Sequence, residues 1–150
     1  MRKMESQVAD AVAKGARVET GGERLCGPGM DSGLFFAPTV LTGITPDMQI
    51  YREETFGPIA PILQFEDDQE VIAMANDTRY GLASYVYTRD LSRALRVSEA
   101  LKFGMVGIND INPTAAAAPF GGVKESGMGR EGAQEGLMEY LDTKLVGISV

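Results

Sequence analysis

The chain has 150 residues, enough for one domain with a substantial core and too few for two ordinary domains. Its hydrophobic content of 44% and charged content of 23% are typical of globular proteins and argue against disorder. The net charge of −7 argues against a nucleic-acid partner, and no apolar run approaches the roughly 20 residues that a membrane span requires.

Two further features of the composition concern chemistry and compartment. Histidine is absent, which removes Ser–His and Cys–His nucleophile pairs, histidine general bases and HExxH sites, and we expect no metal. Cys26 is the only cysteine, so an internal disulfide is impossible and a reducing compartment is favoured. The first residues carry two positive charges but lack the apolar segment of a secretory signal. We therefore expect a cytoplasmic protein.

The first third of the chain predicts one helix and two strands. The helix is expected over 4–16, ending near Gly15, because apolar residues recur at helical spacing: Met4, Val8, Ala11 and Val12. Strands are expected over 16–20 and, after a Gly- and Pro-rich loop over 21–33, over 35–44. Pro38 indicates either an edge strand or an irregular start of the second strand.

Between residues 58 and 109 the pattern alternates regularly. Strands are predicted over 58–65, 83–88 and 104–109. Helices are predicted over 67–78, with Asp67 or Asp68 as the cap, and over 90–102. Their apolar faces follow helical spacing: Val71, Ile72 and Ala75 in one, Leu91, Ala94, Leu95, Ser98 and Leu101 in the other. Short links between such elements are typical of parallel βαβ units, so the sequence predicts an α/β fold with a parallel βαβαβ core.

The pattern changes after residue 109. Residues 110–129 show no periodicity, and so long a loop in a compact domain is usually functional. A helix is predicted over 130–142 and an apolar strand over 144–150. Because the strand has no hairpin partner in the sequence, it would leave an open sheet edge unless another surface covered it.

The string GMGREG at 127–132 has the G-x-G-x-x-G spacing of dinucleotide-binding loops. Such a loop also needs a preceding strand and an acidic residue about 20 positions further on. The preceding VKES is polar, and the chain offers no such acidic residue. We interpret these glycines as residues that permit positive φ and close backbone approach before a helix.

Several strings, in order, resemble the C-terminal part of the aldehyde dehydrogenase superfamily. EETFGPIAP at 53–61 and PFGGVKESGMGRE at 119–131 carry the resemblance, and YGLASYVYTRD, GMVGIN and GLMEYLDTK support it. It covers nearly the whole chain and is more specific than a glycine spacing, because unrelated strings occur in the right order. Within the family the chain is most similar to the succinate-semialdehyde dehydrogenases.

The resemblance implies roles for four residues. Glu54 matches the glutamate that binds the nicotinamide ribose hydroxyls, and Phe56 matches the aromatic residue beside the nicotinamide ring. The alternatives are a solvated charge and a core residue, respectively. Phe120 matches an aromatic residue that lines the aldehyde tunnel, its alternative being a loop anchor. Thr114 stands where semialdehyde dehydrogenases have a serine that contacts the distal carboxylate of the substrate, and it keeps the hydroxyl but adds a methyl group.

The resemblance also implies which parts of the enzyme lie outside the matched region. The nucleophilic cysteine, the general-base glutamate, the oxyanion asparagine and the cofactor-binding fold of the family are all upstream of it. Cys26 is not in the family's cysteine motif, so no catalytic residue is expected in this chain.

The function implied is that of the C-terminal fragment of an aldehyde dehydrogenase. Residues 1–109 would be part of the catalytic domain, and 110–150 would supply the substrate loop, the terminal helix and an oligomerisation strand. The complete enzyme would be a homo-oligomer that oxidises an aldehyde, with succinate semialdehyde as a candidate, to a carboxylic acid with NAD or NADP through a cysteine thiohemiacetal. The 150 residues alone are expected to be inactive. The alternative is a truncated product or an assembly module without catalysis of its own.

Overall fold

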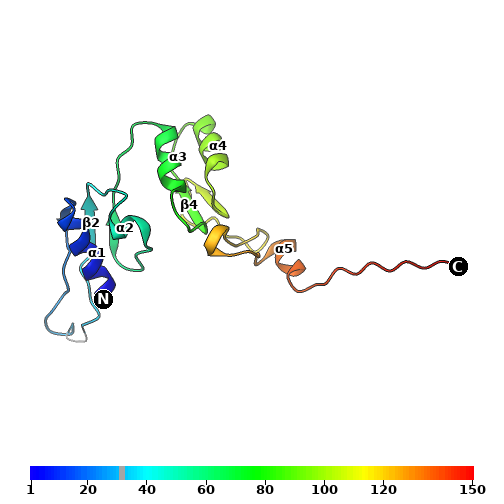
Figure 1. The fold of residues 1–150 in the computed structure, drawn as a ribbon, viewed down its shortest axis with the longest axis horizontal. Helices are drawn as coiled ribbons and strands as arrows, with labels where there is room; N and C mark the ends of the chain where they lie inside the picture. Colours follow the sequence, from blue (N-terminus) through cyan, green and yellow to red (C-terminus); the bar gives the residue numbers. More distant parts are fainter. Residues whose placement is uncertain (31–32) are drawn as a thin grey trace. The chain divides into compact units, whose positions relative to one another are not determined.

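The chain divides into two compact units, Met1–Phe65 and Glu66–Val150, in a computed structural model that describes residues 1–30 and 33–150 (Figure 1). Residues 31 and 32 of the predicted loop over 21–33 lie outside the described residues. The predicted division into 1–109 and 110–150 follows the expected roles of the two parts and not their packing into compact units. That division stays a prediction.

The first unit is a three-stranded sheet with two helices. It contains α1 (Arg2–Ala13), β1 (Arg17–Thr20), β2 (Thr39–Thr42), α2 (Gln49–Arg52) and β3 (Ile59–Pro61), with the strands in the order β1-β2-β3. β1 runs antiparallel to β2, and β3 runs parallel to β2 with Val40 opposite Ala60. Pro38 precedes β2, which confirms the irregular start; the edge-strand alternative is wrong, because β2 lies between the other two strands.

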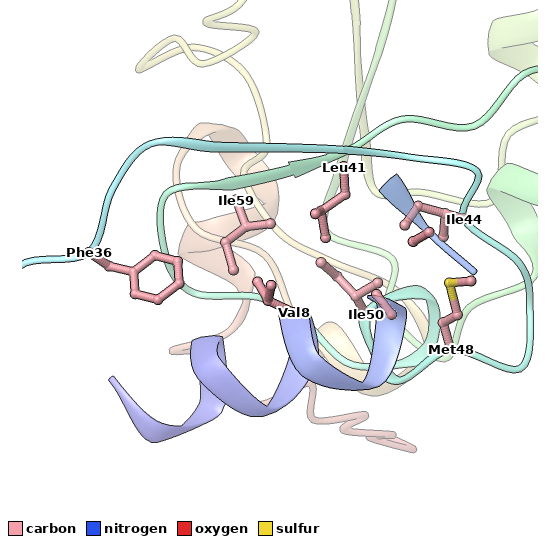
Figure 2. Packing of buried hydrophobic residues seen from close by; sticks show 9 residues of the cluster. Val8, Phe36, Leu41, Ile44, Met48, Ile50 and Ile59 are labelled. Carbon is pink, nitrogen blue, oxygen red and sulfur yellow. The ribbon is translucent and has the colours of Figure 1, made fainter. Parts of the chain in front are cut away.

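Residues from α1, β2, β3 and the α2 region form the core of this unit. Figure 2 shows Val8 of α1 pointing toward the strands that carry Leu41 and Ile59. Burial of Val8 and Ala11 confirms the predicted helical face, but the predicted position of Val12 on that face is wrong, because its side chain is 48% exposed. Gln7 is fully buried instead, because Thr55 supplies a hydrogen bond to its amide oxygen.

The second unit contains a parallel βαβ unit. Its elements begin with α3 (Asp68–Asn76), β4 (Ala83–Val86), α4 (Leu91–Ala100) and β5 (Met105–Ile108), and β4 pairs with β5 in parallel. Asp67 caps α3 by accepting from the backbone N–H of Gln69 and Glu70, and Asp90 caps α4 in the same way. The β4–α4–β5 part of the predicted βαβαβ core is therefore formed, whereas β3 is only three residues long and pairs with β2.

Polar contacts join α3 to α4 at both ends. The Asp68 carboxylate accepts from Arg96 at 2.6 Å and pairs with Arg93 at 3.0 Å, and these hydrogen bonds lower the pKa of Asp68. At the other end the Asn76 side chain donates to Ala100 O at 2.9 Å and accepts from Lys102 N at 2.7 Å. On α4 the buried residues are Ala94 and Val97, so the predicted inward positions of Leu91 and Leu95, both exposed, are wrong.

The last forty residues contain little regular structure. A short 3₁₀ turn, η1 (Lys124–Ser126), is followed by α5 (Ala133–Met138), which is shorter than the predicted helix over 130–142. Residues 144–150 are exposed and form no strand, because no second backbone pairs with them here. Among the described helices, none is long and apolar enough to cross a membrane.

Candidate functional site

Glu54 and Phe56 lie in an irregular segment that follows α2. Glu53 ends the helix with φ −109° and ψ 135°, and residues 54–56 belong to no helix or strand. Glu54 is exposed and the Phe56 ring is 90% exposed, while Thr55 between them is half-buried. Phe56 is thus not a core residue of this unit. Two side chains of the types that the resemblance assigns to a nicotinamide nucleoside are both presented to solvent.

The backbone of this segment is held by α1. The Lys3 ammonium donates to the carbonyl oxygen of Glu54, and the Thr55 hydroxyl donates to Gln7 Oε1 at 2.9 Å. At Gly57 the backbone passes so close to α1 that a Cβ would lie 2.4 Å from Met4 Sδ. The segment is therefore fixed on its inner side.

The exposed groups of the segment are an acceptor and an aromatic ring. The Glu54 carboxylate has no hydrogen-bond or ion-pair partner among the residues that the structure describes, so all its acceptor sites are available. A carboxylate accepts hydrogen bonds from the two hydroxyls of a ribose, and an exposed phenyl ring offers a flat apolar surface to an aromatic ring.

In the second unit, Phe120 is the first residue of a loop whose two ends are joined by hydrogen bonds. Its N–H donates to Glu131 O and its carbonyl accepts from Glu131 N–H, both at 2.7 Å, so residues 120–131 begin and end side by side. The Arg130 guanidinium donates through Nη1 to Gly122 O and Gly129 O, each at 2.8 Å. Arg130 therefore closes the loop from within.

The same loop is attached to the start of β4. Val123 N–H donates to Gly81 O at 3.0 Å, and Gly81 N–H donates to Ser126 Oγ at 2.9 Å. Glu125 N–H donates to Arg79 O at 3.1 Å. These bonds fix the position of the loop that carries Phe120.

A cavity of about 320 Å³ opens beside this loop. Phe120 lines it, but Thr114 does not. Thr114 is exposed, and its hydroxyl donates to Asn112 Oδ1. The structure thus brings Phe120, and not Thr114, to the cavity. The lining residues are Leu82, Phe120, Gly121, Gly122, Ser126, Gly127, Gly129, Arg130, Glu131 and Glu139.

Two other sequence interpretations concern the glycines and the cysteine. Gly132, with φ 70°, immediately precedes α5, and Gly127 has φ 148°, so GMGREG meets a backbone requirement as interpreted. Cys26 is a free, exposed thiol. Within residues 1–30 and 33–150, no group of three or more Cys, Asp or Glu side chains is arranged to hold a metal ion.

Sequence reasoning missed the residues that hold the site in place. Gln7 carries no motif, and Thr55 and Arg130 lie within the matching strings at 53–61 and 119–131 without being singled out there. One signal was available for Gln7: it lies three residues after Met4 and four before Ala11, so a helical projection places a polar side chain among apolar ones.

Three comparisons with known proteins, by family model, by sequence and by structure, each match this chain to aldehyde dehydrogenases. The model of the aldehyde dehydrogenase family matches residues 1–146. A probable succinate-semialdehyde dehydrogenase [NADP(+)] of Sinorhizobium fredii is 54% identical over 144 residues, which are 96% of this chain and 28% of the relative. A glutarate-semialdehyde dehydrogenase of Pseudomonas putida is 50% identical over 148 residues, 99% of this chain and 30% of the relative. A structure of betaine aldehyde dehydrogenase from Staphylococcus aureus in complex with NAD+ superposes with a TM-score of 0.89 at 48% identity, over 95% of this chain and 28% of that one.

The chain therefore spans less than a third of the length of these relatives.

Proposed function

The chain belongs to the aldehyde dehydrogenase family, and on that premise we propose that it is the C-terminal portion of an enzyme that oxidises an aldehyde to a carboxylic acid with NAD or NADP. The observation that carries the proposal is the segment 53–58, whose backbone is fixed on α1 while Glu54 and Phe56 remain exposed. The cysteine that forms the thiohemiacetal, and the general base, would come from outside these 150 residues.

Each proposed residue has a defined task. Glu54 holds the nicotinamide ribose through its carboxylate, and Phe56 fixes the orientation of the ring by contact with its face. When bound, the nicotinamide accepts the hydride that the aldehyde carbon loses. Phe120 supplies an apolar wall for the aldehyde, so that the reactive carbon is oriented and water is excluded.

The substrate class proposed is an aldehyde with a distal carboxylate. The names of two relatives, a succinate- and a glutarate-semialdehyde dehydrogenase, support this class. Within this chain the hydroxyl of Thr114 is the group proposed for the distal carboxylate, and it would have to leave Asn112 Oδ1, to which it donates here, while residues 115–118, all alanine, add no polar side chain. The remaining donors for a carboxylate would come from the rest of the enzyme. A cytoplasmic location completes the proposal and is supported by the free thiol of Cys26.

We expect the isolated 150-residue chain to show no NAD- or NADP-dependent oxidation of succinate semialdehyde, because it contains no activated nucleophile. The complete polypeptide that includes these residues is expected to be active. Reduced cofactor formation, followed by absorbance, measures both. Cys26→Ser serves as the control, and turnover by the isolated chain that survives this substitution would contradict the proposal.

The terminal segment is proposed to associate with another copy of the enzyme. Leu145 is 96% exposed, Val146 and Ile148 are also exposed, and the backbone over 144–150 pairs with no described strand, so the segment offers an open edge and an apolar surface. Deleting Lys144–Val150 from the complete enzyme is expected to lower its oligomeric state, measured by light scattering. Replacing the exposed, uncontacted Gly147 with alanine leaves the segment in place and provides the control. An unchanged mass after the deletion would show that the segment has no part in association.

A further inference from the structure

The segment that carries Glu54 and Phe56 is attached to α1 at three successive points. Lys3 donates to the Glu54 carbonyl, Gln7 accepts from the Thr55 hydroxyl, and Met4 packs against the backbone of Gly57. Residues three and four apart share one face of a helix, so one face of α1 supports the whole segment. Of the three contacts, only the one at Thr55 joins two side chains and fixes a direction.

The partner of Thr55 is in an unusual state for a buried amide. Gln7 is fully buried, its Oε1 accepts from Thr55, and its Nε2 is buried without a hydrogen-bond partner among the described residues. Burying a polar side chain at the centre of an apolar helix face is costly to stability. The cost is offset only at Oε1, by a hydroxyl that lies between the two proposed cofactor-binding residues. The position of Gln7 is therefore better suited to holding Thr55 than to stabilising the core.

We propose that Gln7 and Thr55 are positioning residues for the nicotinamide nucleoside. Their hydrogen bond fixes the position of Thr55 relative to α1, and thereby the positions of Glu54 and Phe56 relative to the cofactor. The inference rests on the proposed function, because it assigns Glu54 and Phe56 to that ligand. It adds two residues that do not touch the ligand. Adjacency in the chain explains how they act, since Thr55 lies between Glu54 and Phe56, and a shift of Thr55 toward or away from α1 moves both of its neighbours.

Two substitutions in the complete enzyme test the proposal. They are expected to change the melting temperature differently but to weaken cofactor binding equally. Thr55→Val keeps the shape but leaves the Gln7 amide with no partner at either end, so the melting temperature should fall. Gln7→Met removes the buried amide while keeping its length, so the melting temperature should stay the same or rise. Both variants should raise the Kd for NAD+ and for NADP+, measured by calorimetry without aldehyde, about fivefold, as expected for loss of one hydrogen bond.

The controls separate positioning from general damage. Thr55→Ser retains the hydroxyl and should restore the Kd. Thr42→Val removes a hydroxyl that donates to Glu19 Oε1 at 2.6 Å in the same unit, and it should leave the Kd unchanged. The KM for the aldehyde should not change in any of the four variants. If the Kd rises only in Thr55→Val, the variant with the lower melting temperature, and not in Gln7→Met, then lost stability explains the weaker binding and the proposal is overturned.

Glu54→Gln distinguishes a failure of this inference from a failure of the proposed function. If Glu54→Gln weakens cofactor binding while Thr55→Val and Gln7→Met bind normally, only the positioning role is overturned. If Glu54→Gln binds both cofactors as tightly as the unsubstituted enzyme, the role of Glu54 is wrong and the positioning role is overturned with it.

Discussion

Replacing Gly104 with alanine is expected to lower the free energy of unfolding by about 1–3 kcal/mol and to displace the loop that carries Phe120. Gly104 lies just before β5, where the loop crosses it. A Cβ there would lie 1.9 Å from Gly121 O, 2.9 Å from Gly121 C and 3.0 Å from Gly122 Cα. All three atoms belong to the backbone, so no side chain can rotate away and the loop itself must move. Phe120 is adjacent in sequence to the displaced residue.

Two measurements test this expectation. Urea unfolding of the complete enzyme reports the loss of stability, and the KM for the aldehyde reports the displacement of Phe120 and should rise. The Kd for the cofactor should stay constant, because Glu54 and Phe56 belong to the other unit. Gly147→Ala is the matched control, since no atom lies within 4 Å of a Cβ at that position. Unchanged unfolding and KM in Gly104→Ala would contradict the close approach of the loop.

The parts of the fold that the sequence predicts best are those determined by local chemistry. α3 and α4 begin where Asp67 and Asp90 can accept from free backbone N–H groups, and this depends only on neighbouring residues. The strands β4 and β5 follow from their β-branched and aromatic residues with short links to α4. Their parallel pairing follows from the length of the connection between them.

The parts that could not be predicted depend on contacts distant in sequence. Val12 fits the apolar face of α1 by spacing, yet Gln7 is buried in its place because Thr55, 48 residues away, provides a partner. β3 pairs with β2 across a helix, and the apolar residues 144–150 form no strand without a second backbone. Periodicity identifies an element but not its partner.

The candidate site shows the same division between the residues proposed to face a ligand and the residues that support them. The strings that resemble the family single out Glu54, Phe56 and Phe120, which we propose meet the cofactor and the aldehyde. Gln7, Thr55 and Arg130 support them through hydrogen bonds whose partners only the folded chain brings together. A site residue can therefore be found by pattern, whereas the residue that holds it must be found by geometry.

Substituting Glu54 with glutamine in the complete enzyme is expected to slow hydride transfer about tenfold or more without a change in the fold. The carboxylate accepts from both hydroxyls of a ribose, whereas the amide keeps a single acceptor oxygen and loses the charge, and a charged hydrogen bond contributes about 1.5–3 kcal/mol. The Glu54 carboxylate is exposed and has no protein partner within the described residues, so the melting temperature should not change. The rate of reduced-cofactor formation in a single turnover is the direct measurement.

A deuterated aldehyde makes the Glu54 test specific for the step concerned. If Glu54 holds the nicotinamide in place for transfer, the isotope effect on the steady-state rate should increase in Glu54→Gln, because hydride transfer then limits turnover. Glu53→Gln is the matched control, since it removes the same charge from the adjacent residue, which is also exposed. Equal effects of the two substitutions would indicate a general electrostatic influence. A slower transfer and a larger isotope effect confined to Glu54→Gln are expected if the carboxylate itself binds the ribose.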